Sequence, residues 1–159
     1  MIRSIGAPVR SVHVVLGSVV ALAACASSDT SYHIETDGPL RVKDAWVRAT
    51  NVTGPGAMYL TLENTDTAAV TILGAATPLA GAAEFHETTE MQGMEGMSHM
   101  NKLDSIPVAR GATLAMKPGG LHIMLIDLKK SLTLGDTVPL VIRLSDGRTT
   151  SVKAIAREQ

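Results

Sequence analysis

Short segments with alternating apolar and polar residues fill the chain after Pro39, and this two-residue period constrains the fold more than any other feature. In residues 57–63, for example, Met58, Leu60 and Leu62 share one parity. Such alternation is typical of half-buried β-strands, and no long window has the period of a helix. Strands are therefore expected at residues 40–49, 57–63, 68–73, 82–88, 113–116, 121–128, 138–144 and 149–156.

Turn-forming residues separate these segments, for example Pro118-Gly119-Gly120 and Asp146-Gly147. Many short strands with this punctuation predict an all-β domain, built as an antiparallel sandwich or barrel. The roughly 120 residues that follow Pro39 are enough to bury one core.

The first expected strand, residues 40–49, contains apolar residues on both parities. Leu40, Val42 and Trp46 share one parity, whereas Ala45 and Val47 take the other. In an uninterrupted strand, residues of one parity point to the same face. Trp46 is therefore expected on the same face as Leu40 and Val42.

Residues 1–24 have the features of a targeting signal. Arg3 and Arg10 are their only formal charges, and the mostly apolar run that follows is too short to span a bilayer comfortably. The run ends Leu22-Ala23-Ala24-Cys25, which resembles the bacterial lipoprotein signal, where cleavage precedes a cysteine that carries lipid. We therefore expect lipidation of Cys25; the alternative is an ordinary secretory signal with an incidental cysteine.

This signal divides the chain into a signal peptide (1–24), a lipid-anchored polar tether (25–38) and a β-domain (39–159). Cys25 is the only cysteine, so no intramolecular disulfide can form. His33 lies in the tether and is expected to be solvated. A lipid anchor would hold the exported protein on the extracytoplasmic side of the cell membrane.

The charge balance gives no sign of a nucleic-acid partner. The whole chain has a formal net charge of −1, and residues 1–24 contribute two arginines and no acidic residue. The remaining chain is therefore more acidic still, whereas a nucleic-acid-binding domain needs a basic face.

Methionine and histidine are concentrated in residues 86–124. This stretch holds six of the eight methionines and three of the five histidines. The histidines are His86, His99 and His122, and the methionines are Met91, Met94, Met97, Met100, Met116 and Met124. The neighbours of the 91–100 run are Gln, Gly, Glu and Ser, which make a poor core segment. Metal binding is therefore favoured over packing for this run.

A ligand set of thioethers and imidazoles points to copper. A thioether is soft and neutral and binds Cu(I) well, whereas the sulfur ligands of zinc are normally thiolates. The expected metal is Cu(I) first, with Cu(II) as a second candidate. Within the expected strand 121–128, His122 and Met124 are two residues apart and so share one face, while Ile123 and Leu125 face the core. By the same reasoning, Phe85 packs inward and His86 outward.

The chain from Leu40 to Glu158 resembles the periplasmic copper chaperone family called PCuAC. The signature of that family is His, ten residues, Met, twenty-one residues, His-x-Met, and here Met100 and His122 enclose twenty-one residues before Met124. Also similar are DAWVR at 44–48, YLTLEN at 59–64 and KPGGLHIML at 117–125. The resemblance implies a cupredoxin-like Greek-key β-barrel that binds one Cu(I) through two His and two Met. It also implies delivery of copper to the binuclear site of cytochrome c oxidase, with an oxidase subunit or another copper chaperone as partner.

The spacing departs from the family at one place. Thirteen residues separate His86 from Met100, whereas Met97 stands at the ten-residue spacing. We favour Met100, because a ligand close to the following strand requires less of the loop to be ordered. The expected primary ligands are His86, Met100, His122 and Met124, with Met91, Met94, Met97 and His99 as secondary ligands or a metal-indifferent loop.

Other functions find less support. The chain has no G-x-S-x-G, Walker or H-E-x-x-H motif, so an enzyme is not expected. A blue-copper electron carrier needs a cysteine thiolate, and Cys25 is assigned to lipid. The remaining alternatives are a lipoprotein that sequesters copper for resistance and a β-sandwich scaffold lipoprotein that binds no metal.

Overall fold

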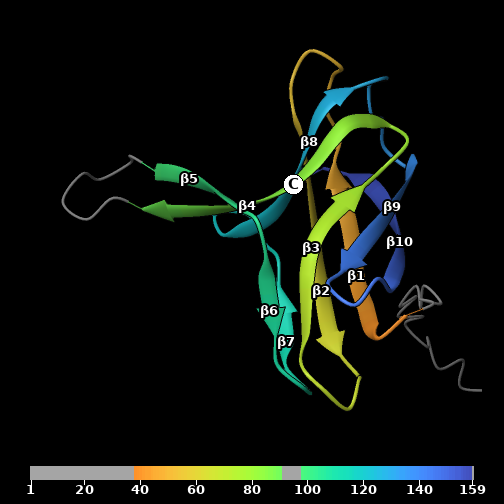
Figure 1. Ribbon diagram of the computed structural model, residues 1–159. Coiled ribbons are helices and arrows are strands. Elements are labelled where there is room, and N and C mark those ends of the chain that lie inside the picture. The colour runs from red at the N-terminus through yellow and green to blue at the C-terminus, as the bar shows by residue number, and fades with distance from the viewer. Residues whose placement is uncertain (1–37, 91–97, 159) are drawn as a thin grey trace, which may run out of the picture. The chain divides into compact units, whose positions relative to one another are not determined.

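Ten strands make up the regular structure in the computed structural model, which describes residues 38–90 and 98–158 (Figure 1). No helix occurs in those two ranges, so the all-β expectation is confirmed. No helix long and apolar enough to cross a membrane is therefore found in them either. The strands are β1 Leu40–Arg48, β2 Gly56–Asn64, β3 Val70–Ala76, β4 Ala80–Glu90, β5 Ser98–Leu103, β6 Ile106–Val108, β7 Thr113–Ala115, β8 Leu121–Leu128, β9 Thr137–Leu144 and β10 Thr149–Arg157.

Seven of the strands close into a barrel. Their order is β4-β8-β2-β1-β10-β9-β3, and the pair Ala75–Ala83 joins β3 back to β4. Every pairing is antiparallel except that of β1 with β10. The short strands β5, β6 and β7 add to β4, β3 and β2 respectively. Closure matters because it leaves no free edge among the seven barrel strands.

The barrel core is formed by one side of each strand. In β9 and β10 every second residue is buried, as the two-residue period predicts. Met58 and Met116 are buried in this core, so these two methionines fill space rather than face solvent. The largest fully buried side chains are Leu40, Met58, Leu60, Leu62, Ile72, Ile123, Leu125, Leu132, Leu140, Ile142, Val47 and Val138.

Strand β1 contains a bulge that corrects the expected parity. Asp44 adopts a positive φ of 51°, and the register with β2 shifts between Lys43 and Trp46. An extra residue of this kind reverses the side-chain alternation beyond it. Val42 and Ala45 are therefore both buried, and Trp46 does not share the inward face of Leu40 and Val42 as expected.

Strands β5 and β6 were not expected, and neither was the full length of β4. β4 continues to Glu90, and β5 pairs with it antiparallel from Phe85–Leu103 to Glu90–Ser98. Figure 1 shows this β4–β5 hairpin leading away from the barrel strands. The described part of the expected loop is therefore a strand.

Candidate metal centre

His86 and His122 lie directly opposite each other on neighbouring strands. They are register partners in the β4–β8 pair, although 35 residues separate them in the chain. Their ring centroids are 6.0 Å apart, with an angle of 33° between the planes. Metal–nitrogen bonds to imidazole are about 2.0 Å long. The spacing therefore leaves room for one ion bound to a nitrogen of each ring.

The inward neighbours of the two histidines fix the face on which they lie. Phe85 is 3% exposed, and Ile123 and Leu125 are completely buried in the barrel core. Alternation then turns His86 and His122 to the outer face. Met124 shares that face, because it lies two residues after His122 on β8, opposite Glu84 on β4. The predicted orientations of Phe85 and Ile123 are confirmed.

His122 is held on two sides. Its Nδ1 lies 3.0 Å from the carbonyl oxygen of Gly120, which can only accept a hydrogen bond. Nδ1 therefore carries the proton, and Nε2 keeps a free lone pair. The ring of Tyr59 lies 6.2 Å away, and Trp46 stacks in turn on Tyr59 at 4.6 Å. His122 is only 6% exposed and is fixed in tautomer and position.

His86 presents the opposite arrangement. Its Nε2 lies 3.1 Å from Oε2 of Glu84, while its Nδ1 is buried and has no hydrogen-bond partner among the described residues. An unpaired buried polar atom carries a desolvation cost of about 1–3 kcal/mol and calls for an explanation. A metal ion is one partner that a neutral imidazole nitrogen can bind.

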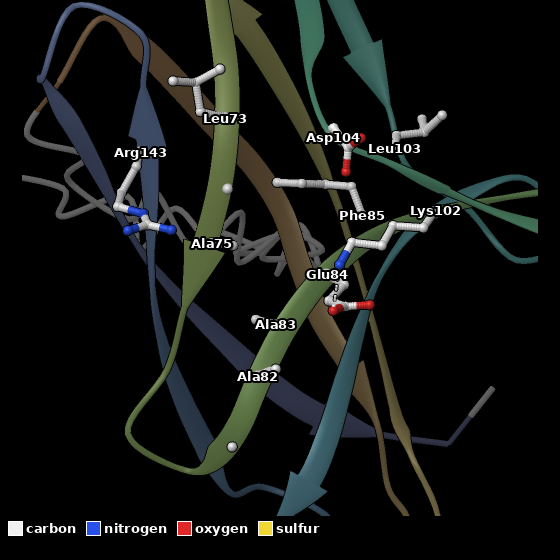
Figure 2. A pocket seen from close by; sticks show the side chains of 12 residues that line it. Leu73, Ala75, Ala82, Ala83, Glu84, Phe85, Lys102, Leu103, Asp104 and Arg143 are labelled. Atoms are coloured by element: carbon white, nitrogen blue, oxygen red, sulfur yellow. Dashed lines mark hydrogen bonds and ion pairs between the residues drawn. The ribbon is translucent and has the colours of Figure 1, made fainter.

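Glu84 also contacts Lys102, whose Nζ donates to Oε1 at 2.7 Å (Figure 2). Lys102 and, to a lesser extent, His86 hold the pKa of the Glu84 carboxyl below its ordinary value, so Glu84 is ionised at neutral pH. Glu84 and Lys102 line one side of a hollow of about 390 Å³, with Leu73 and Arg143 on the other side. Each oxygen of the Glu84 carboxylate thus has one partner.

Met100 shares the outer face of the hairpin but lies further out than the histidines. It pairs with Thr88, whereas the residue opposite His86 on β5 is Lys102. Met100 and Met124 thus flank the histidine pair from opposite ends, four residues apart along β4, or about 13 Å on a regular sheet. Met100 is 46% exposed. Because it belongs to a strand, the expected placement in a mobile loop is corrected.

The secondary candidates are only partly described. His99 pairs with Thr89 and so points to the face of the hairpin opposite that of Met100 and His86. Met91, Met94, Met97, His33 and Cys25 lie outside the described residues. His99 therefore does not extend the centre on its own face.

The donor set fits a soft metal. Within residues 38–90 and 98–158 no group of three or more His, Cys, Asp or Glu side chains could hold an ion. A metal centre at His86 and His122 would therefore take its further donors from thioethers, and Met124 lies on the same face of β8 as His122. Two imidazoles and a thioether match Cu(I) better than a hard cation.

Three residues at this centre were not predicted from the sequence: Glu84, Lys102 and Tyr59. Glu84 could have been predicted from the sequence. It stands two residues before His86, and residues two apart in a strand point to the same face, as His122 and Met124 do. Lys102 and Tyr59 carry no local signal, since their positions beside the histidines depend on strand register.

Comparisons with known proteins identify the family of the chain. The family described as "Putative lipoprotein LpqE-like" matches residues 40–156. "Putative lipoprotein Lxx21020" of Leifsonia xyli subsp. xyli is 36% identical over 118 residues, covering 74% of this chain and 69% of the relative.

Two solved structures are also similar. The solution structure of CuI-DR1885 from Deinococcus radiodurans is 33% identical, covers 84% of both chains and has a TM-score of 0.55. The copper-bound PCuAC domain from PmoF2 has a TM-score of 0.61 at 16% identity, covering 77% of this chain and 95% of that domain, and shows the shared fold alone. The predicted resemblance to PCuAC domains and the cupredoxin-like fold are confirmed. The match over residues 40–156 shows that the chain belongs to the LpqE-like lipoprotein family.

Proposed function

We propose that this protein is an exported, Cu(I)-binding metallochaperone. The observation that carries the proposal is the register pair His86–His122, in which each ring keeps one nitrogen free of hydrogen bonds to the described residues. A pair held in this way by two barrel strands needs little ordering when it binds an ion.

The primary ligands in this proposal are His86, His122 and Met124, with Met100 completing the set from the hairpin. A centre of imidazoles and thioethers, with no thiolate, selects Cu(I) over Zn(II). The name CuI-DR1885 of a 33% identical relative supports the same metal. Met91, Met94, Met97 and His99 are secondary ligands that can deliver copper to the primary site, and Cu(II) is a weaker alternative cargo.

Delivery, rather than storage, is favoured by the exposure of Met100. A ligand that is 46% exposed and lies on the hairpin can be exchanged for a ligand of an incoming partner while the histidines stay in place. The acceptor we propose is the copper-binding subunit of cytochrome c oxidase, at its binuclear site, or another copper chaperone. Lipidation of Cys25, which agrees with the lipoprotein names of the family and of the relative, would hold the protein at the extracytoplasmic membrane surface.

Anaerobic titration of the purified protein with Cu(I), against a competing chelator, tests the metal. We expect one tight Cu(I) site and far weaker Zn(II) binding; comparable affinities for the two metals would contradict the proposal. Incubation of the Cu(I)-loaded protein with an apo oxidase subunit tests delivery. Copper that stays on the chaperone favours sequestration instead.

Mass spectrometry of the protein purified from membranes tests the anchor. We expect a mature chain that begins at a lipidated Cys25. A different first residue, or an unmodified Cys25, would remove the anchor from the proposal without affecting the copper site.

A further inference from the structure

Glu84 is an ionised side chain in direct contact with a proposed copper ligand. It lies two residues before His86 on the same face of β4, and its Oε2 is 3.1 Å from His86 Nε2. An ionised carboxylate has acceptors and no donor. The shared hydrogen therefore belongs to Nε2 of His86, and the lone pair of the neutral ring lies on Nδ1.

Lys102 holds Glu84 in this position. Its Nζ donates to Oε1 at 2.7 Å, and Lys102 is the register partner of His86 on β5. The second oxygen of Glu84 is thereby left for the imidazole. The side chain of Glu84 is 25% exposed, so the contact with His86 is partly shielded from water.

The two neighbouring histidines thus keep different nitrogens free of hydrogen bonds to the described residues. His122 donates from Nδ1 to the carbonyl oxygen of Gly120, which frees Nε2. His86 donates from Nε2 to Glu84, which frees Nδ1, and this Nδ1 is the buried atom without a partner. Ligating histidines commonly donate their other N–H to a carboxylate or a backbone carbonyl, and both patterns occur here side by side.

We propose that Glu84, fixed by Lys102, is a positioning residue that sets His86 in the Nε2–H tautomer, so that copper binds Nδ1 of His86 and Nε2 of His122. This inference rests on the proposed function, because it concerns the same site. The competing arrangement is one in which copper binds Nε2 of His86 and must first displace Glu84. The two arrangements give opposite roles to the carboxylate: a support in the first, a competitor in the second.

Nitrogen-15 NMR of the histidine rings in the purified full chain separates the two arrangements. Without metal, we expect the proton of His86 on Nε2 and that of His122 on Nδ1. On addition of Cu(I) alone, the large shifts should fall on Nδ1 of His86 and Nε2 of His122. A proton on Nδ1 of His86 in the metal-free protein, or copper on its Nε2, overturns the inference.

Variants of Glu84 give an independent readout. Glu84→Ala should weaken Cu(I) binding by about 10- to 100-fold, the usual cost of losing a carboxylate behind a ligating histidine. Glu84→Gln should restore most of the affinity, because the amide oxygen can still accept from Nε2–H. If Glu84 acted only through packing, the Cu(I) affinity would not depend on whether residue 84 can accept a hydrogen bond from Nε2–H of His86. Tighter binding by Glu84→Ala identifies the carboxylate as a competitor and overturns the inference.

Glu63→Ala is the matched control. Glu63 is also a strand glutamate bound by a lysine, with 2.9 Å between its Oε2 and Lys43 Nζ, and its charged partners among the described residues are Lys43 and Arg41 rather than a histidine. We expect its Cu(I) affinity to equal that of the wild type. Absence of Cu(I) binding by the wild type would overturn the proposed function and this inference with it, whereas binding through Nε2 of His86 overturns the inference alone.

Discussion

The barrel wall and the β4–β5 hairpin hold their proposed ligands in different ways. His122 sits on β8, which has a barrel strand on each side, β2 and β4, and the side chain is 6% exposed. Met100 sits on β5, which pairs only with β4 among the described strands, and the side chain is 46% exposed. In the proposed site, the barrel would thus provide a fixed half, and the hairpin would provide a half that can be exchanged.

Strand β4 belongs to both regions, and the burial of its side chains changes along its length. Ala80 and Phe85 are buried in the barrel core, whereas Glu87, Thr89 and Glu90 are exposed on the hairpin. His86 lies where the two parts meet, opposite His122 on one side and Lys102 on the other. Copper bound at this position would be held by the rigid region and released through the exposed one.

Removing a core side chain at the junction is the largest perturbation we predict. Phe85→Ala should lower the free energy of unfolding by about 3–5 kcal/mol, because a buried aromatic ring is replaced by a cavity. Glu87→Ala, two residues on and exposed, should change it by less than about 0.5 kcal/mol. Urea denaturation of both variants measures the contrast. Similar losses for the two variants would mean that the hairpin and the barrel unfold as one equally packed unit.

The next effect is on copper rather than on folding. His122→Ala should weaken Cu(I) binding by more than about 100-fold, since the loss of a ligand should exceed the 10- to 100-fold loss of an outer partner. No other histidine in the described residues lies on that face of β8 to replace it. Competition titration of the variant checks this, with His99→Ala as control because His99 points to the opposite face of the hairpin. Equal losses for the two variants would reject the barrel-wall site.

Substitution of the hairpin ligand Met100 should reduce the Cu(I) affinity less than substitution of His122. Met100→Ala should weaken Cu(I) binding by less than about tenfold, or about 1.4 kcal/mol, because the fixed half of the site remains. We also predict a larger loss for Met100→Ala than for Met97→Ala, since Met100 is already held in β5. The same competition titration compares the two. A larger loss for Met97→Ala would make Met97 the primary ligand.

The barrel could be predicted from sequence because most of its strands carry a buried side chain at every second position. The hairpin could not, because β5 has the sequence SHMNKL, with five exposed residues and no apolar alternation. The bulge at Asp44 was not predicted for a related reason. Apolar residues on both parities show that the alternation changes, but they do not show at which residue the bulge occurs. Tertiary pairing decided both cases.

The candidate site likewise has features that local alternation predicts and features that depend on strand pairing. The orientations of His122 and Met124 follow from local alternation, so the sequence was enough to place them on one face. That His86 stands opposite His122, and Lys102 opposite His86, depends on register between strands far apart in the chain. The choice between Met97 and Met100 depends on how the hairpin closes, which residue spacing alone does not determine.

The smallest effect we predict concerns an ion cluster that ties two turns of the barrel region together. Arg148 pairs with Asp66, after β2, and with Asp146, in the turn between β9 and β10, and it holds the pKa of both carboxyls below the ordinary value of 3.8. A lowered folded-state pKa stabilises the fold above the unfolded-state value, and this contribution is lost as the pH falls through the folded-state value. Arg148→Ala should therefore lower the melting temperature only slightly at pH 7, because Arg148 and Asp146 are exposed and Asp66 is partly exposed, and ion pairs open to solvent contribute little. The difference in melting temperature from the wild type should shrink below about pH 4 and vanish once both carboxyls are protonated in the folded state.

Thermal melts of the wild type and Arg148→Ala from pH 7 to pH 2 measure this convergence. Lys153→Ala, on the neighbouring β10, is the control for loss of a surface cation. A difference that stays constant with pH would show that Arg148 acts through packing of its stem, and not through the two carboxylates.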